Sequence, residues 1–429
     1  MTLKLRNWAG NYEYSTVSVQ HPQTVEQVQA LVRQTPKLKA LGTRHSFNTI
    51  ADSVDQFIAL DQLDSAVSID RQRSRATIGA RFNYGELAEI LQREGYALHN
   101  LASLPHISVV GACATATHGS GVGNQNLSSE VAALDLVTAD GELVSLSRER
   151  DGETFLGAVV GLGALGVVVS MTLDVLPTFN VRQNVFENLP INQLETHFDE
   201  IVASAYSVSL FTDWQTDRIN EVWLKAKADA KADAKADDSP YSPRTEFFGA
   251  TAATKPLHPI ASVPPENCTE QLGVVGSWNE RLPHFRYDAM PSAGSELQSE
   301  YFVARADALA ALRAIRSLAP LIAPHLLISE IRTIAADNFW MSPCRQQDSV
   351  GIHFTWKMDW PSVKSLLPQI EARLTPFDAR PHWGKLFTMP PARLQALYPK
   401  LLEFRQLIQH FDPHGKFRNA FLETNLFGN

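Results

Sequence analysis

The fold of this chain is decided by residues 41–48 (LGTRHSFN), taken together with a run of small residues at 111–121 (GACATATHGSG). Glycine and its small neighbours let the backbone N–H groups of a turn approach a phosphate closely. The first segment also places the imidazole of His45 beside such a turn. A histidine by itself is more often an ordinary loop residue, so the prediction of a phosphate-bearing ligand depends on the pairing of the two segments.

The composition indicates a multi-domain protein without a nucleic-acid partner. With 429 residues, 44% of them hydrophobic, the chain is too long for a single core and predicts two or three domains. Its net charge of -8 leaves no basic excess to neutralise nucleic-acid phosphates.

Cysteine usage and the N-terminal residues favour a reducing compartment. Cys113, Cys268 and Cys344 are odd in number and lack the spacing of a disulfide framework or a zinc site, so we expect no bound metal. No apolar segment follows the first basic residues, as a secretory signal would require. We therefore expect a cytoplasmic protein.

Residues 155–173 form an uncharged run of 19 residues, whose length alone would suffice to span a bilayer. Four glycines interrupt the run and its second half is β-branched, so we predict a short helix, a glycine turn and a buried strand, and no membrane span. The glycines at 161, 163 and 166 match a dinucleotide-binding fingerprint, but there the strand precedes the helix. Nicotinamide binding is therefore not expected.

Local signals before residue 180 predict an α+β unit. Capping boxes at 24–27 and 83–86 predict two helices, and 38–41, 57–60 and 75–78 read as short strands. The Asp140-Gly141 pair predicts a hairpin over 131–147. Much further on, residues 225–238 alternate Lys, Ala and Asp without an apolar face, which predicts an exposed, mobile insertion.

From about residue 295 the pattern predicts strand 296–303, helix 305–318, strand 326–334, strand 351–357 and helix 361–374. This order is typical of a split βαββαβ arrangement, an antiparallel sheet with helices on one side.

Polar side chains recur two residues apart on these strands and so share a face. The pairs are Glu330 with Arg332 and His353 with Thr355, and Gln298 is placed alike. The strands of a sheet with one face in solvent would also alternate polar and apolar side chains. The mixture of an acid, a base, an imidazole, a hydroxyl and an amide favours a site that binds a polyol, because each substrate hydroxyl both donates and accepts hydrogen bonds.

Seven motifs spread over nearly the whole chain resemble the alditol (xylitol) oxidases of the vanillyl-alcohol oxidase superfamily. Several of the motifs are shared with lactone oxidases; the Ser103 segment, Gln298 and the two strand pairs are more specific. The motifs are 7–11 (NWAGN), 102–108 (ASLPHIS), 117–124 (THGSGVGN), 209–214 (SLFTDW), 296–301 (ELQSEY), 380–385 (RPHWGK) and 416–421 (KFRNAF).

The resemblance implies an α+β, two-domain FAD-binding fold of the PCMH (vanillyl-alcohol oxidase) type with an antiparallel-sheet substrate (cap) domain. We expect an FAD-binding domain over 1–180, a cap domain over 181–378, and a C-terminal segment, 379–429, that returns to the FAD domain.

By the same resemblance, His45 is bonded covalently to the 8α-methyl carbon of FAD and a second set of residues lines the substrate pocket. The substrate-binding residues are Ser103, Gln298, Glu330, Arg332, His353, Thr355 and Lys385. The other cofactor-binding residues are Leu41, Gly42, Thr43, Arg44, Ser46, Ser103, Ser108, Gly111, Cys113, Thr115, Thr117, His118, Val168, Lys416 and Asn419.

Two residues depart from the family pattern. Arg44 stands where a small residue, commonly Gly, precedes the tethering histidine; if the turn needs a positive φ, its Cβ costs about 1 kcal/mol. Cys113 lies near where bicovalent relatives carry a second flavin bond, but its surroundings differ, so we expect a buried small residue.

The implied reaction is oxidation of a terminal hydroxyl of an acyclic polyol such as xylitol or sorbitol to the aldose, with hydride transfer to flavin N5 and reduction of O₂ to H₂O₂. We expect Arg332 and Lys385 to stabilise the developing alkoxide, and either Glu330 or His353 to accept the proton. The partners expected are the substrate and O₂, without nucleic acid or membrane, for a monomer.

Two alternatives remain open. A sugar-1,4-lactone oxidase or dehydrogenase, of the gulono-, galactono- or arabinono-lactone type, would use the same fold and tether on a ring carbon. A flavin-binding module without turnover would lack the polar strand faces, so their presence argues against it.

Overall fold

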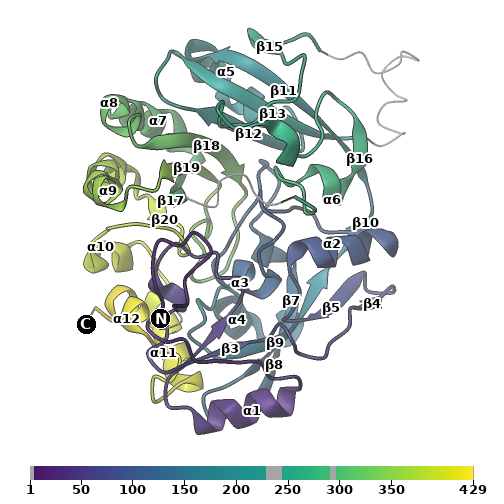
Figure 1. Ribbon diagram of the computed structural model, residues 1–429, viewed down its shortest axis with the longest axis vertical. Coiled ribbons are helices and arrows are strands. Elements are labelled where there is room, and N and C mark those ends of the chain that lie inside the picture. Colours follow the sequence, from purple (N-terminus) through teal and green to yellow (C-terminus); the bar gives the residue numbers. More distant parts are fainter. Residues whose placement is uncertain (1–3, 229–243, 290–295, 429) are drawn as a thin grey trace.

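The computed structural model describes residues 4–228, 244–289 and 296–428. Its lower half in Figure 1 holds a small parallel sheet and a five-stranded sheet. The parallel sheet has the order β1 (Val19–Gln20), β3 (Gln56–Ala59), β2 (Leu38–Leu41). The larger sheet has the order β4 (Ser68–Asp70), β5 (Arg75–Gly79), β9 (Val167–Asp174), β7 (Val131–Val137), β8 (Leu143–Ser147).

The two helices predicted from capping boxes are confirmed. Helix α1 (Val25–Gln34) begins after Thr24, whose hydroxyl accepts a hydrogen bond from the Gln27 N–H. Helix α2 (Tyr84–Arg93) begins after Asn83, and both halves of the capping box with Glu86 are present. The β7–β8 hairpin around Gly141, whose φ is 81°, is confirmed as well.

The uncharged run at 155–173 forms the end of α4 (Arg148–Val159), a turn and strand β9 (Val167–Asp174), as predicted, although only every second residue of β9 is buried. Gly163 (φ 63°) and Gly166 (φ 158°) give the turn a backbone that other residues rarely adopt. Across the three described ranges, we find no helix with the length and apolar character that a membrane crossing requires.

The upper half contains a ten-stranded sheet, shown in Figure 1 with α5 (Ile191–Val202), α7 (Ala308–Arg316), α8 (Ala319–Ile322) and α9 (Trp360–Leu374) on its outer side. Its order is β14, β15, β11, β13, β12, β18, β19, β17, β20, and β16 also pairs with β11. The predicted βαββαβ order is confirmed in β17 to β20, but the sequence did not predict that β12 joins β18 and continues the sheet. The strands are β11 (Asn180–Pro190), β12 (Ser207–Thr212), β13 (Arg218–Lys227), β14 (Glu246–Phe247), β15 (Ala250–Ala252), β16 (Val275–Ser277), β17 (Glu296–Ala304), β18 (Leu326–Ile334), β19 (Ser349–Lys357) and β20 (Arg380–Pro381).

Two predictions about this half need correction. The predicted helix 305–318 is a 3-10 turn, Arg305–Asp307, followed by the shorter α7. The charged stretch that was predicted to be exposed begins inside β13, where Lys225 is buried because its amino group finds carbonyl acceptors in the interior. Residues 229–238 of that stretch lie outside the described residues.

The C-terminal segment packs against the N-terminal part of the chain. The Leu38 N–H donates to the Lys416 carbonyl at 3.0 Å, and the Asn419 amide donates to the carbonyls of Thr49, Ile50 and Asp52. The domain boundaries at 180 and 378 stay a prediction. The remaining elements are β6 (Tyr96–Ala97), α3 (Val109–Ala114), β10 (Leu176–Pro177), α6 (Trp278–Arg281), α10 (Pro391–Ala396), α11 (Leu401–Phe411) and α12 (Ala420–Leu422).

Candidate active site

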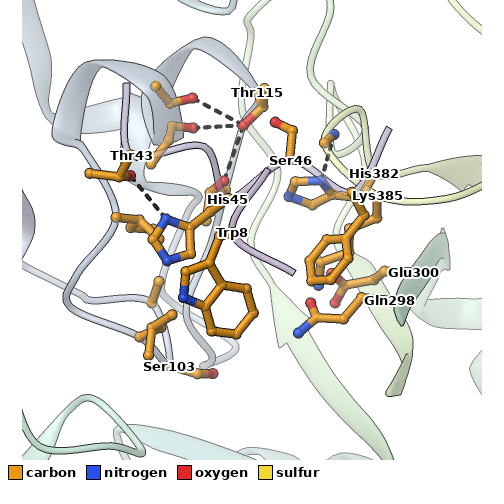
Figure 2. Close-up of a pocket in the computed structure, with 18 of the residues that line it drawn as sticks. Trp8, Thr43, His45, Ser46, Ser103, Thr115, Gln298, Glu300, His382 and Lys385 are labelled. Carbon is orange, nitrogen blue, oxygen red and sulfur yellow. Dashed lines mark hydrogen bonds and ion pairs between the residues drawn. The ribbon is translucent and has the colours of Figure 1, made fainter. Parts of the chain in front are cut away.

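Two adjoining cavities meet at the 41–48 turn, the first between the two halves of the molecule and the second within the lower half. The first, of about 310 Å³, is bounded by the 41–48 turn, the 102–118 segment and the inner face of β17, β18 and β19. The second, of about 450 Å³, lies behind the turn and shares Gly42, Ser108 and Gly111 with the first. Figure 2 shows Trp8 and His45 on one side of the first cavity, and Gln298, Glu300 and Lys385 on the other.

The 41–48 turn has the strained backbone conformation at Arg44 that the sequence analysis considered. Arg44 has a φ of 63°, in the left-handed region where a side chain costs about 1 kcal/mol. Its guanidinium donates to the Arg6 carbonyl at 3.2 Å, and its own carbonyl accepts from the Trp8 N–H at 2.8 Å. The N-terminal residues therefore hold the turn in this conformation.

His45 is a neutral, partly unpaired imidazole at the edge of the cavity. Burial, and then the nearby His106, lower the pKa of His45 to about 4. Its ring stacks on Trp8 with centroids 5.0 Å apart, and Nδ1 lies 3.0 Å from the Thr43 hydroxyl. Nε2 is buried and has no hydrogen-bond partner among the described residues. A neutral imidazole with an available lone pair suits covalent attachment to a ligand.

The turn also has the backbone donors that a diphosphate needs. Within the described ranges, the N–H groups of residues 43–46 donate to no protein acceptor. A Cβ at Gly42 or Gly111 would lie 2.6 or 2.5 Å from the Ser108 hydroxyl, so both glycines allow a close approach of the chain. A ligand with phosphates and a group that reacts with His45 fits this surface.

The opposite wall of the first cavity carries the polar set predicted from the strands. Arg332 on β18 donates to the Ser103 hydroxyl at 3.3 Å, across the cavity from its own strand. Lys385 donates to Nδ1 of His353 at 2.8 Å, so the other ring nitrogen carries the proton and donates to the Thr355 hydroxyl at 3.0 Å.

Glu300, which the sequence reasoning missed, lies between the two cations. Its carboxylate accepts from Arg332 at 3.0 Å and from Lys385 at 2.7 Å, and it lies 3.2 Å from Nε2 of His118. Burial by itself raises the pKa of Glu300, but Lys385, His118 and Arg332 together hold it well below its ordinary value. A buried carboxylate thus keeps both cations in place.

Burial and the neighbouring charges shift the pKa of Lys385 in opposite directions. Burial lowers the pKa of the Lys385 ammonium, Glu300 raises it and Arg332 lowers it again, with a net lowering. Lys385 is therefore a cation whose proton is held less firmly than that of an exposed lysine.

A second carboxylate, Glu330, faces the same cavity. Its Oε1 lies 2.7 Å from Nε2 of His284, and its Oε2 lies 3.5 Å from Nε of Arg332. Arg332 and His284 hold the pKa of Glu330 below its ordinary value although burial raises it. His284 and His382, which also lines the cavity, were not predicted, because each stands in a segment without the strand periodicity that identified the others.

Most of the predicted residues line one or both cavities. Val168 lines the second cavity only. Cys113, Lys416 and Asn419 line neither: the Cys113 thiol lies in the core beside Tyr84, and the other two join the C-terminal segment to the N-terminal part. The first cavity is lined by Leu41, Gly42, Thr43, Arg44, His45, Ser46, Ser103, Ser108, Gly111, Thr115, Thr117, His118, Gln298, Glu330, Arg332, His353, Thr355 and Lys385.

Comparison with known proteins agrees with this geometry. Residues 18–147 match a family model described as an FAD binding domain, and residues 289–425 match one described as D-arabinono-1,4-lactone oxidase. The fold resembles that of a crystal structure of cholesterol oxidase from B. sterolicum, with a TM-score of 0.77 and 14% identity over 99% of this chain and 96% of that chain. Fold and site define an FAD-dependent oxidoreductase of the vanillyl-alcohol oxidase type.

The particular family follows from the curated relatives. The chain is 44% identical to the alditol oxidase of Streptomyces sp. strain IKD472 over the full length of both proteins. It is 25% identical to the L-gulonolactone oxidase of Mus musculus over 98% of each. The chain belongs to the alditol oxidase family.

Proposed function

We propose that this protein oxidises a terminal hydroxyl of an acyclic polyol such as xylitol or sorbitol to the aldose, and that FAD is bonded covalently to His45. Bound FAD would supply a hydride acceptor for the substrate carbon and a route for the electrons to O₂, which would yield H₂O₂. We propose further that residues 1–180 form the FAD-binding domain, that 181–378 form the substrate-binding cap, that 379–429 return to the FAD domain, and that the protein is a cytoplasmic monomer.

The observation that carries the proposal is the convergence of Arg332 and Lys385 on Glu300, on the wall that faces His45. Two cations near one point stabilise an alkoxide as a hydroxyl loses its proton, and an alkoxide carbon is a better hydride donor. Glu300 offsets part of their charge, which makes the burial of both cations possible.

The other side chains on this wall suit successive hydroxyls. The Oε2 of Glu330 accepts and the Gln298 amide both donates and accepts, as does the Ser103 hydroxyl from across the cavity; the ring of His353 is oriented by its two partners. Glu330 takes the hydroxyl proton at Oε2, or His353 takes it at Nδ1, the ring nitrogen that accepts from Lys385. Lactone oxidation is the alternative raised by the C-terminal family model, and the 44% identity to an alditol oxidase favours the polyol.

A substrate series tests the proposal. Peroxide formation is measured with xylitol, sorbitol and 1-propanol, whose single hydroxyl leaves most of the polar wall unpaired. Each buried polar group without a partner costs about 1–3 kcal/mol, so we expect kcat/KM for xylitol to exceed that for 1-propanol by at least about two orders of magnitude. Comparable values would contradict the polyol assignment.

A further inference from the structure

Behind Glu330 lie two buried residues that the proposed function does not use, Lys225 and His284. Lys225 is on β13 and is 1% exposed; His284 follows α6 and is 5% exposed. The His284 N–H donates to the carbonyl of Ser103 at 3.1 Å, which places this histidine against the cavity. Both residues therefore lie directly behind the substrate wall.

The side chains of Lys225, His284 and Glu330 form a continuous chain of hydrogen bonds. The amino group of Lys225 lies 2.7 Å from the carbonyls of Leu282 and Pro283 and 3.2 Å from Nδ1 of His284. On the other edge of the ring, Nε2 lies 2.7 Å from Oε1 of Glu330. The Ser209 hydroxyl is a weaker neighbour of Nε2, at 3.5 Å.

These contacts are consistent with one arrangement of protons. The Glu330 carboxyl is ionised, so the facing Nε2 carries a proton. Burial lowers the pKa of His284 to about 4, so the ring is neutral and Nδ1 is an acceptor. Lys225 must then donate to three acceptors, which requires an ammonium. Burial lowers the pKa of Lys225 and so favours its neutral amine. A neutral amine that donates to both carbonyls would, however, turn its lone pair toward the lone pair of Nδ1, with no proton between the two nitrogens.

We propose that Lys225 is a positioning residue for the reaction: it fixes the Nε2–H tautomer of His284, which in turn holds the Glu330 carboxylate toward the substrate. The part that concerns Glu330 rests on the proposed function, whereas the tautomer does not. Among the described residues, His284 is the only hydrogen-bond donor to the Glu330 carboxylate. Oε2 lies 3.5 Å from Nε of Arg332 without a hydrogen bond and can accept one from a substrate hydroxyl.

The charged groups around His284 determine how its pKa responds when Lys225 is replaced. Lys225 and Arg332 lower the pKa of His284 and Glu330 raises it, while Arg281 and Cys268 face Lys225, and His353 faces Glu330. Lys225→Met removes one of the two cations near His284. Glu330 still requires a proton on Nε2, so the ring then takes up a second proton at Nδ1 at a pH nearer neutral.

The first test reads the tautomer directly by NMR of ¹⁵N-histidine-labelled holoenzyme. We expect His284, assigned by the signal missing in His284→Gln, to be the Nε2–H form between pH 6 and 8 in the wild type. Lys225→Met should shift it toward the doubly protonated form. Lys227→Met, on the same strand with an exposed side chain, should leave it unchanged. An Nδ1–H form in the wild type would overturn the proposal, whether or not Lys225→Met folds.

The second test separates an effect through His284 from a general loss of structure. Lys225→Met should raise the KM for xylitol about tenfold, as expected when a hydrogen bond to a charged group is weakened. In the His284→Gln background the same change should alter KM less than about twofold. Equal increases in both backgrounds would overturn the proposal. A wild type without polyol oxidation would contradict the proposed function alone, and the NMR result would then decide on the tautomer.

Discussion

Arg44 and His45 show how much a single residue contributes to this site. The positive φ of Arg44 turns the chain so that His45 projects beside the cavity, and the cost of that conformation is offset by hydrogen bonds to the N-terminal residues. His45 is neutral because it is buried. The unpaired Nε2 and the free N–H groups around it support the proposal that His45 tethers FAD.

His45→Ala is expected to fold and to bind FAD without a covalent bond, because the backbone donors and both glycines remain. The measurement is the visible absorbance of acid-precipitated protein, which should stay yellow in the wild type and turn colourless in the variant. His106→Ala, a change at a neighbouring histidine outside both cavities, is the matched control and should stay yellow. Yellow His45→Ala would place the bond on another residue.

Arg332→Met and Lys385→Met are each expected to slow flavin reduction by about two to three orders of magnitude, because each removes a donor to a developing oxyanion. Anaerobic rapid mixing with saturating xylitol measures this step without interference from O₂. Lys357→Met on β19, whose exposed amino group donates to the Pro324 carbonyl, is the control. Reduction at near wild-type rates in both variants would exclude them from the chemistry.

At the level of elements, strand periodicity was sufficient to predict one wall of the site. The faces of Glu330, Arg332, His353 and Thr355 follow from a two-residue repeat, and the structure brings them to one cavity. Glu300 obeys the same repeat, two residues after Gln298, and that signal was overlooked. His284 could not be predicted this way, because it stands in an irregular segment that only the tertiary fold brings behind β18.

Glu300→Gln should move the alkaline limb of the pH profile for flavin reduction to lower pH. Glu300 raises the pKa of Lys385, so its removal lowers that pKa further, and the ammonium is then lost earlier as pH rises. The measurement is the anaerobic reduction rate by xylitol between pH 6 and 10 in both proteins. An unchanged limb would show that Lys385 is not the titrating group.

At the level of the whole molecule, the sequence predicted two folding units but not the size of the upper sheet. The βαββαβ pattern of residues 296–381 was recognisable because its strands are close in sequence. The pairing of β12 with β18 joins segments more than a hundred residues apart, and local periodicity carries no information on such a contact. Local periodicity could not predict that Lys225 and Glu221, two ionisable residues of this sheet, are buried.

Glu221→Gln tests the electrostatics of this sheet apart from catalysis. Burial raises the pKa of Glu221 from 4.5 to about 7. Because the folded value exceeds the unfolded one, the stabilisation is present below pH 4.5 and is lost as pH rises through 7, at a cost of about 3 kcal/mol. Gln still accepts from the Trp223 indole. The variant should therefore raise the melting temperature at pH 8 and have little effect at pH 4.5; equal shifts would contradict this.

The most direct test of the central claim is anaerobic reduction of the bound flavin by two substrates, xylitol and L-gulono-1,4-lactone, each at saturation. The polar wall and the paired cations predict that xylitol bleaches the flavin at least about a hundredfold faster than the lactone, since we propose that a terminal hydroxyl of xylitol binds at Arg332 and Lys385 while its other hydroxyls pair with the wall. Equal amounts of H₂O₂ and oxidised xylitol should appear when O₂ is admitted. Faster bleaching by the lactone, or none by xylitol, would contradict the account.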